Sequence, residues 1–270
     1  MALDPQFLAV AVDTALAAGR LQLQYFRGDL EIRKKGLRDL VTAADLAVEQ
    51  AIRDRLARYF PDHAVLGEET APSAPAGSSR YRWIVDPIDG TTNFAHGVPL
   101  FCVSIALEVG GRIDVGVVYA PVSGELFTAE RGEGARLNGT RLCVTGEASL
   151  SEALLVTGFP PQAADSLDDQ LAVFGAFLAS ARAVRRLGSA ALDLAFVAAG
   201  RFDGFWEASL HAWDVAAGVL LVEEAGGLVT DFHGGPFDNF GGQLLASNGA
   251  LHPRLLEMLV DARARPGSAE

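Results

Sequence analysis

The spacing of apolar residues changes along this chain, and it constrains the fold more than any other feature. Over residues 7–26 and 42–59, apolar side chains recur every three or four positions, the period of a helix with one buried face. Over 81–129 they recur at every second position, the period of β-strands. After about residue 150, short apolar segments and helical patterns follow one another in turn. The pattern predicts an α+β first half, with helices before an antiparallel meander, and an α/β second half.

The second predicted helix carries its own start and stop signals. Thr42 can cap it, and Asp45 completes the spacing of a capping box. Pro61 is expected to end the helix. Its predicted buried face consists of Val48, Ile52, Leu56 and Tyr59. The polar residues 27–41 before it are predicted as a loop.

The remaining predicted elements divide near residue 150. Strands are expected at 64–67, 81–85, 101–109, 115–120, 125–129, 154–157, 183–187, 203–207, 228–231 and 244–247, and helices at 168–181, 190–199, 213–225 and from about 253. We therefore expect an N-terminal α+β part, residues 1–150, and a C-terminal α/β part, residues 151–270. A chain of 270 residues can bury enough surface to pack both parts as one compact unit.

The composition excludes several classes of protein. The chain has 22 Lys+Arg and 34 Asp+Glu, a net charge of −12, so direct nucleic-acid binding is not expected. Its apolar runs reach only about eight residues, whereas a membrane span needs roughly 18. The first residues lack the basic start of a secretory signal. The two cysteines have no CxxC neighbour, which favours a reducing, cytoplasmic location over a disulfide framework or a zinc site.

Two carboxylates lie close together in the segment WIVDPIDGTTNF, residues 83–94. Asp86 comes at the end of a predicted strand, Pro87 fixes the backbone, and Asp89 follows three residues after Asp86. Both side chains are expected to leave one tight turn. Since two close carboxylates repel each other unless cations lie between them, and Mg²⁺ prefers oxygen ligands, the segment is a candidate metal site.

The residues directly after this pair suit a phosphate. Gly90, Thr91 and Thr92 offer successive backbone N–H groups and hydroxyls, and a helix beginning at Thr91 would add its positive end. An Asp-rich surface turn would show the same residue types, because Asp and Gly are common in turns.

Three further acids are candidates, and each has a plainer interpretation. Glu68, next to Glu69, follows a short strand and could be part of a solvated acidic pair. Asp214 begins an apolar helix, where an acid is commonly a cap. Glu207 ends an apolar strand and needs either a partner or contact with water.

Five segments together resemble the inositol monophosphatase family. They are DLVTAAD at 39–45, GEE at 67–69, WIVDPIDGTTNF at 83–94, GSAALDLAFVAAGRFDGFWE at 188–207 and HAWDVAAG at 211–218. The resemblance covers about residues 5–260, and its two long motifs are specific. It implies the layered αβαβα sugar-phosphatase fold, a homodimer, and a lithium-sensitive phosphatase that uses two or three Mg²⁺ ions.

The resemblance also implies roles for individual residues. The implied metal ligands are Glu68, Asp86, Asp89, Asp214 and the carbonyl group of Ile88. Thr91, with Glu68 and Asp45, would position and activate the attacking water. The implied substrate contacts are Asp89, Gly90, Thr91, Thr92, Gly188, Ser189, Ala190, Glu207 and Asp214. Lys34, or the adjacent Lys35, would lie on a mobile polar loop near a third, weaker metal.

The activity so implied is that of an inositol-phosphate phosphatase. It would hydrolyse inositol monophosphate, or a similar polyol or sugar phosphate, by in-line attack of a metal-activated water without a covalent intermediate. Superfamily relatives act on histidinol phosphate, fructose 1,6-bisphosphate, NADP or 3′-phosphoadenosine nucleotides, and the phosphate half of the site does not separate these substrates. The forms DGTTNF and GFWE, at 89–94 and 204–207, favour the polyol.

A regulatory role is an alternative of another class, since some bacterial relatives associate with transcription machinery. Arg185 and Arg186 form a small basic spot that could serve such a contact, although a solvated pair is the plainer interpretation. His211 precedes Asp214 by three residues, but Mg²⁺ prefers oxygen, so His211 is expected to be structural. His96 and Cys102 are likewise expected to be structural.

Overall fold

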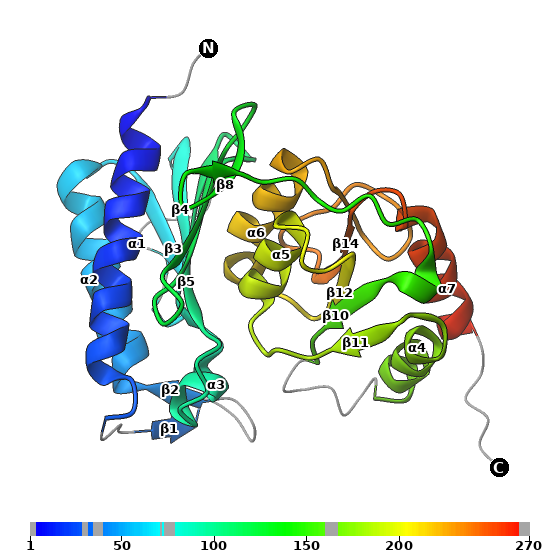
Figure 1. Ribbon diagram of the computed structural model, residues 1–270. Coiled ribbons are helices and arrows are strands. Elements are labelled where there is room, and N and C mark those ends of the chain that lie inside the picture. Colours follow the sequence, from blue (N-terminus) through cyan, green and yellow to red (C-terminus); the bar gives the residue numbers. More distant parts are fainter. Residues whose placement is uncertain are drawn as a thin grey trace.

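Helices and sheets alternate in layers (Figure 1). The structure, a computed structural model, describes residues 4–28, 32–34, 40–70, 72, 79–159 and 167–264. The helical layers are α1 (Gln6–Tyr25) with α2 (Ala43–Tyr59), α5 (Ala190–Ala198) with α6 (Ala212–Glu224), and α4 (Leu167–Ser180) with α7 (His252–Ala264). A seven-stranded sheet lies between the first two pairs and a five-stranded sheet between the last two (Figure 1). This order confirms the predicted αβαβα fold.

The first sheet contains the predicted meander. Its strands, in spatial order, are β3 (Ala64–Gly67), β4 (Tyr81–Asp89), β5 (Cys102–Val109), β6 (Arg112–Ala120), β7 (Glu125–Glu130), β8 (Gly134–Leu137) and β9 (Thr140–Arg141). Only β3 and β4 pair in parallel within this sheet. β4 runs beyond the predicted end at Val85, because its pairing with β5 resumes at Asp89 after an irregularity that follows Asp86. The two carboxylates therefore lie on a bulged strand end and not on a simple tight turn.

The second sheet is mixed. Its strands, in spatial order, are β11 (Ala183–Arg185), β10 (Leu154–Thr157), β12 (Gly204–Ala208), β14 (Gln243–Ser247) and β13 (Leu228–Thr230). β10 pairs in parallel with β11 and β12, whereas β14 is antiparallel to β12 and β13. The predicted alternation of strands and helices is confirmed along the whole second half.

Short elements complete the described chain. The polar segment predicted as a loop contains β1 (Ile32–Lys34) and β2 (Leu40–Thr42), which pair antiparallel. Lys34 lies in β1, and Lys35 lies outside the described residues. A short helix, α3 (Thr91–Ala95), begins at Thr91 as expected, and a 3₁₀ turn, η1 (Leu150–Glu152), precedes β10.

One core joins the two sheets through α5 and α6. Buried residues of the first sheet, such as Phe127, belong to the same cluster as Leu220 of α6 and Phe205 of the second sheet. This core contains residues from both sides of residue 150. The division of the chain into two parts near that residue stays a prediction. Among the residues that the structure describes, no helix is long and apolar enough to cross a membrane.

The predicted buried face of α2 is right at three of its four positions. Val48, Ile52 and Leu56 are buried, but Tyr59 is 50 % exposed. The helix ends at Tyr59, and the following Phe60 packs against the apolar cluster in its place. The prediction for Tyr59 was wrong: it is the last residue of the helix, and the chain leaves the helical path at Phe60.

Candidate active site

Three carboxylates converge where the bulged end of β4 meets the start of α6. Asp86, Asp89 and Asp214 each offer a carboxylate oxygen, and these oxygens lie within 4.8 Å of one another. Asp214 is the third residue of α6, and its Oδ2 accepts a 2.7 Å hydrogen bond from the backbone N–H of His211, the N-cap residue. We call these three residues the acidic centre.

Burial and mutual repulsion raise the pKa values of two carboxyl groups in this centre. Burial, with the negative charges of Glu68, Asp89, Asp214 and Asp45, holds the pKa of Asp86 well above its usual range. Burial, followed by the charge of Asp214, raises the pKa of Asp89 to about 7. A divalent cation would relieve this repulsion, and a set of carboxylate oxygens is the donor set that Mg²⁺ prefers.

The start of α5 orients Asp89. Its Oδ2 accepts hydrogen bonds from the hydroxyl of Ser189 at 2.6 Å and from the backbone N–H of Ala191 at 2.7 Å. The backbone N–H of Ala190 also hydrogen-bonds to this carboxylate. Ser189 is the N-cap of α5 and is buried. These bonds fix one carboxylate oxygen of Asp89 against the second half of the chain.

The predicted capping box of α2 also supports the site. Asp45 Oδ2 accepts from the backbone N–H of Thr42 at 2.7 Å and from its hydroxyl at 2.5 Å. Asp45 Oδ1 lies 3.1 Å from the hydroxyl of Thr91, which also lies 3.0 Å from the carbonyl oxygen of Ile88. Burial raises the pKa of Asp45, and its bonds from Thr42 and Thr91 oppose that shift. Asp45 therefore both caps a helix and fixes the Thr91 hydroxyl.

Glu68 is half-buried directly after β3 and lies outside the group of three, although its charge raises the pKa of Asp86. A residue absent from the sequence analysis holds this strand end. Glu49 of α2, fully buried, accepts a 2.8 Å hydrogen bond from the backbone N–H of Glu69 and another from the hydroxyl of Thr70. Its carboxylate also pairs with Arg53 at 2.8 Å. The sequence could have indicated Glu49, because it lies one helical turn after Asp45 and next to the predicted buried face of the helix.

Gly90 makes the turn between β4 and α3. Its φ of 98° lies in the left-handed region, and a Cβ there would lie 2.9 Å from the carbonyl oxygen of Leu100, so only glycine fits. Nearby, Asn93 donates from Nδ2 to the carbonyl oxygens of Leu100 at 2.7 Å and Leu187 at 2.8 Å. Asn93 thus ties this turn to the second half of the chain. Asn93 belongs to the segment WIVDPIDGTTNF, but the sequence analysis assigned it no role.

The other predicted phosphate and substrate residues surround this turn. Thr91 and Thr92 are the first residues of α3, with Thr92 exposed. The carbonyl oxygen of Gly188 lies 3.3 Å from the position that a Cβ on Gly90 would take. Segments far apart in sequence therefore meet at one place, where β4, α3 and α5 come together.

Glu207 lies near the end of β12, and the negative charges of Asp214 and Asp89 act on its carboxyl group. Burial, followed by the charge of Asp214, raises the pKa of Glu207 to about 8, while Arg186 opposes the shift. Asp193 of α5 lies in the same charged environment, and sequence reasoning missed it. It is 1 % exposed, neither of its carboxylate oxygens has a hydrogen-bond partner among the described residues, and burial raises its pKa well above the usual range.

The residues expected to be structural lie around the site without forming part of the acidic centre. The ring of His211 stacks on Trp213 at 4.8 Å between centroids. Cys102 is buried with its thiol 3.8 Å from Asp89 Oδ2, and burial raises its pKa. Both cysteines are free thiols.

Comparison with known proteins identifies the family of the chain. The model of the inositol monophosphatase family matches residues 4–264. The chain is 47 % identical to Nus factor SuhB of Pseudomonas aeruginosa, over 92 % of this chain and 94 % of that protein. It is 45 % identical to inositol-1-monophosphatase of Mesorhizobium japonicum, over 93 % and 94 %.

Solved structures show the same likeness. The extragenic suppressor protein suhB of Bartonella henselae has a TM-score of 0.90 and 42 % identity, covering 94 % of this chain and 98 % of that one. The inositol monophosphatase of Anabaena has a TM-score of 0.88 and 41 % identity, covering 98 % of both chains. With its acidic centre, its αβαβα layers and a family match over nearly its whole length, the chain belongs to the inositol monophosphatase family.

Proposed function

We propose that this chain is a Mg²⁺-dependent phosphomonoesterase that hydrolyses inositol monophosphate or a similar polyol or sugar phosphate. The observation that carries the proposal is the convergence of Asp86, Asp89 and Asp214, whose oxygens lie within 4.8 Å of one another at a site of strong mutual repulsion. Two or three Mg²⁺ ions would be held by these carboxylates, by Glu68 and by the carbonyl group of Ile88. Bound Mg²⁺ would supply charge neutralisation and activation of water.

The chain's own residues would orient the reactants. The Thr91 hydroxyl, fixed beside Asp45 Oδ1 at 3.1 Å, would hold the attacking water, with Glu68 as its second partner. The backbone N–H groups of Gly90 and Thr91 would receive the phosphate oxygens. Such positioning contributes much of the rate in phosphoryl transfer, because the protein makes no covalent bond to phosphorus.

The leaving alcohol would lie on the side of Glu207. This carboxyl group stands beside the acidic centre, and polyol hydroxyls can both donate to a carboxylate and accept from a protonated acid. Gly188, Ser189 and Ala190 would shape this side of the site. Thr92 and the Lys34 or Lys35 loop would lie at its edge, so their predicted roles are part of this proposal.

Mg²⁺-dependent phosphate release tests the proposal. The substrates are inositol 1-phosphate, histidinol phosphate, fructose 1,6-bisphosphate, NADP and 3′-phosphoadenosine 5′-phosphate, each measured with and without Li⁺. A lead of tenfold or more in kcat/KM for inositol 1-phosphate, about 1.4 kcal/mol, supports the polyol. A lead for another substrate refutes the polyol assignment and keeps the phosphatase. No Mg²⁺-dependent release from any of them refutes the phosphatase.

A second candidate function is favoured by the relatives named Nus factor SuhB. The chain would contact transcription machinery as a regulatory protein, through the exposed Arg185 and Arg186 at the edge strand β11 and the residues after it. Asp89→Asn separates the two functions, because it should stop phosphate release without changing that surface. Capture of purified transcription factors by Asp89→Asn, lost in Arg185→Ala, supports the contact. No capture by either protein refutes it.

We also propose a cytoplasmic homodimer, on the family resemblance and the two free thiols. Light scattering after size exclusion gives the mass in solution. A mass near 28.5 kDa at all concentrations would contradict the dimer.

A further inference from the structure

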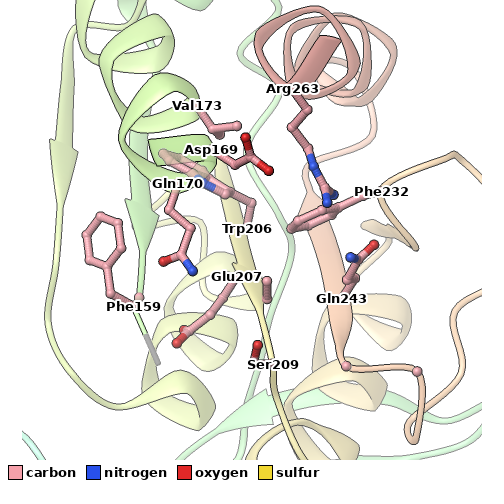
Figure 2. Close-up of a pocket in the computed structure, with 14 residues that line it drawn as sticks. Phe159, Asp169, Gln170, Val173, Trp206, Glu207, Ser209, Phe232, Gln243 and Arg263 are labelled. Carbon is pink, nitrogen blue, oxygen red and sulfur yellow. The ribbon is translucent and has the colours of Figure 1, made fainter. Parts of the chain in front are cut away.

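A cavity lies on the face of the second sheet that α4 and α7 cover (Figure 2). Its volume is about 330 Å³, within the range of small-molecule sites. α4, α7, the end of β12 and the residues around Phe232 and Gln243 surround it (Figure 2). Of the residues given roles above, Glu207 also lines this space, whereas Trp206, Phe232, Arg263 and Asp169 have been given none.

Alternation along β12 separates the cavity from the acidic centre. Phe205 packs in the core between the two sheets, whereas Trp206 packs with Phe177 of α4 on the opposite face, 4.2 Å between ring centroids. Glu207, on the Phe205 side, also lines the cavity, but its side chain points away from the Trp206 ring (Figure 2). A ligand in the cavity would therefore lie against Trp206 and not in the phosphate site.

The floor of the cavity suits a flat ring. Trp206, Phe232 and Val173 line it, and these side chains are only 6 %, 5 % and 4 % exposed in the protein. Aromatic walls of this kind favour stacked or edge contacts with an aromatic ring.

The polar wall carries both signs of charge. The Arg263 guanidinium lies over the Phe232 ring, 5.4 Å from its centroid, so it is braced at the cavity. Asp169 in the first turn of α4 contributes a carboxylate. Within the described part of the chain, neither residue has an ion-pair partner, although both line the same 330 Å³. An anion alone would leave Asp169 unmatched, and a cation alone would leave Arg263 unmatched.

We propose that this cavity binds a small zwitterion with an aromatic ring, a molecule of the aromatic α-amino acid class. The ring would lie on Trp206 and Phe232, the carboxylate on Arg263 and the ammonium on Asp169. The amides of Gln170 and Gln243, also in the lining, would serve the remaining polar groups. The groups that carry this proposal, Trp206, Phe232, Arg263 and Asp169, have no role in the proposed phosphatase, although Glu207 also lines the cavity.

Three probes with one ring system test the charge requirement. Calorimetric titration of the full chain would use L-tryptophan as the zwitterion, indole-3-propionate as the anion and L-tryptophanamide as the cation. The variants are Arg263→Gln and Asp169→Asn, both at exposed positions that should leave folding intact. The matched controls are Arg254→Gln, on the same helix in an exposed pair with Glu257, and Asp168→Asn, which is next to Asp169 but outside the lining.

The zwitterion should bind the unmodified chain more tightly than either single-charge probe. Arg263→Gln should weaken L-tryptophan and indole-3-propionate about tenfold and leave L-tryptophanamide unchanged. Asp169→Asn should weaken L-tryptophan and L-tryptophanamide by a similar factor and leave indole-3-propionate unchanged. The two control variants should bind all three probes as the unmodified chain does.

Other outcomes overturn the proposal. Absence of L-tryptophan binding at concentrations up to about 5 mM would remove the site. Binding that neither cavity variant weakens would place the ligand elsewhere. An anion that binds as tightly as the zwitterion and ignores Asp169→Asn would assign the cavity to anions alone.

Discussion

Gly158→Ala offers a sharp test of the role given to Glu207. Gly158 follows β10 by one residue, and a Cβ at this position would lie 2.0 Å from Glu207 Oε2 and 2.3 Å from its Cδ. The absence of a side chain at Gly158 therefore allows the Glu207 carboxyl group to lie where it does. An added methyl group would change the position of that carboxyl group without changing its chemistry.

The size of the effect follows from this distance. Cβ contacts essentially never fall under 3.0 Å, so the carboxyl group must retreat by roughly 1 Å. A displacement of that size at a substrate-binding group costs about 10- to 100-fold in kcat/KM, or about 1.4–2.8 kcal/mol. The main change should be in KM, because the acidic centre that activates water is not touched.

Steady-state kinetics on inositol 1-phosphate, with a Mg²⁺ titration and a thermal melt of each variant, give the measurement. Gly175→Ala is the matched control: it makes the same change in α4, where a Cβ would meet nothing within 4 Å. It should leave kinetics unchanged and stabilise the protein by about 0.5–1 kcal/mol. Gly158→Ala in a Glu207→Gln background should then add little further loss, because both changes act on one group.

Three results would refute this reasoning. An unchanged KM in Gly158→Ala would mean that the position of Glu207 does not matter for the substrate. A loss as large in the Glu207→Gln background as in the unmodified chain would mean that Gly158 acts through another contact. A lowered melting temperature with unchanged kinetics would assign Gly158 to folding alone.

The remaining predictions concern the acidic centre and its supports. Asp89→Asn should abolish Mg²⁺-dependent turnover but stabilise the metal-free protein at pH 8 by roughly 2–4 kcal/mol, because it removes a buried repulsion; an equal or lower melting temperature contradicts this. The folded-state pKa of Asp89, about 7, exceeds its usual 3.8, so the folded chain binds more protons than the unfolded chain between these values. The metal-free melting temperature should therefore fall as pH rises from about 4 to 7, and saturating Mg²⁺ should remove this trend. Glu49→Gln should weaken the apparent Mg²⁺ affinity about tenfold, with kcat restored at high Mg²⁺, because Glu49 holds the backbone directly after Glu68. An unchanged Mg²⁺ titration would contradict that role. Asn93→Ala should lower the free energy of unfolding by about 2–3 kcal/mol, because the carbonyl groups of Leu100 and Leu187 lose their hydrogen bonds. Chemical denaturation measures this change, and a loss below about 1 kcal/mol would contradict it.

Features that depend on near neighbours in the chain could be predicted from the amino-acid sequence. Helical and strand periods were visible because buried faces repeat every 3.6 or two residues, and the capping box of Thr42 and Asp45 needs only a spacing of three. The closeness of Asp86 and Asp89 was likewise a local property of one segment. The family motifs then gave the order of layers.

The tertiary structure alone decided what depends on long-range register. The bulge in β4 is set by its pairing with β5, and at the end of α2 it is Phe60, not the exposed Tyr59, that packs against the apolar cluster. Glu207 meets Gly158 only because β10 and β12 pair in parallel at one register. The aromatic cavity beside Arg263 exists because α7 closes over the same sheet face as α4. Such contacts join residues tens of positions apart, and their distances follow from how whole elements pack, which no local pattern encodes.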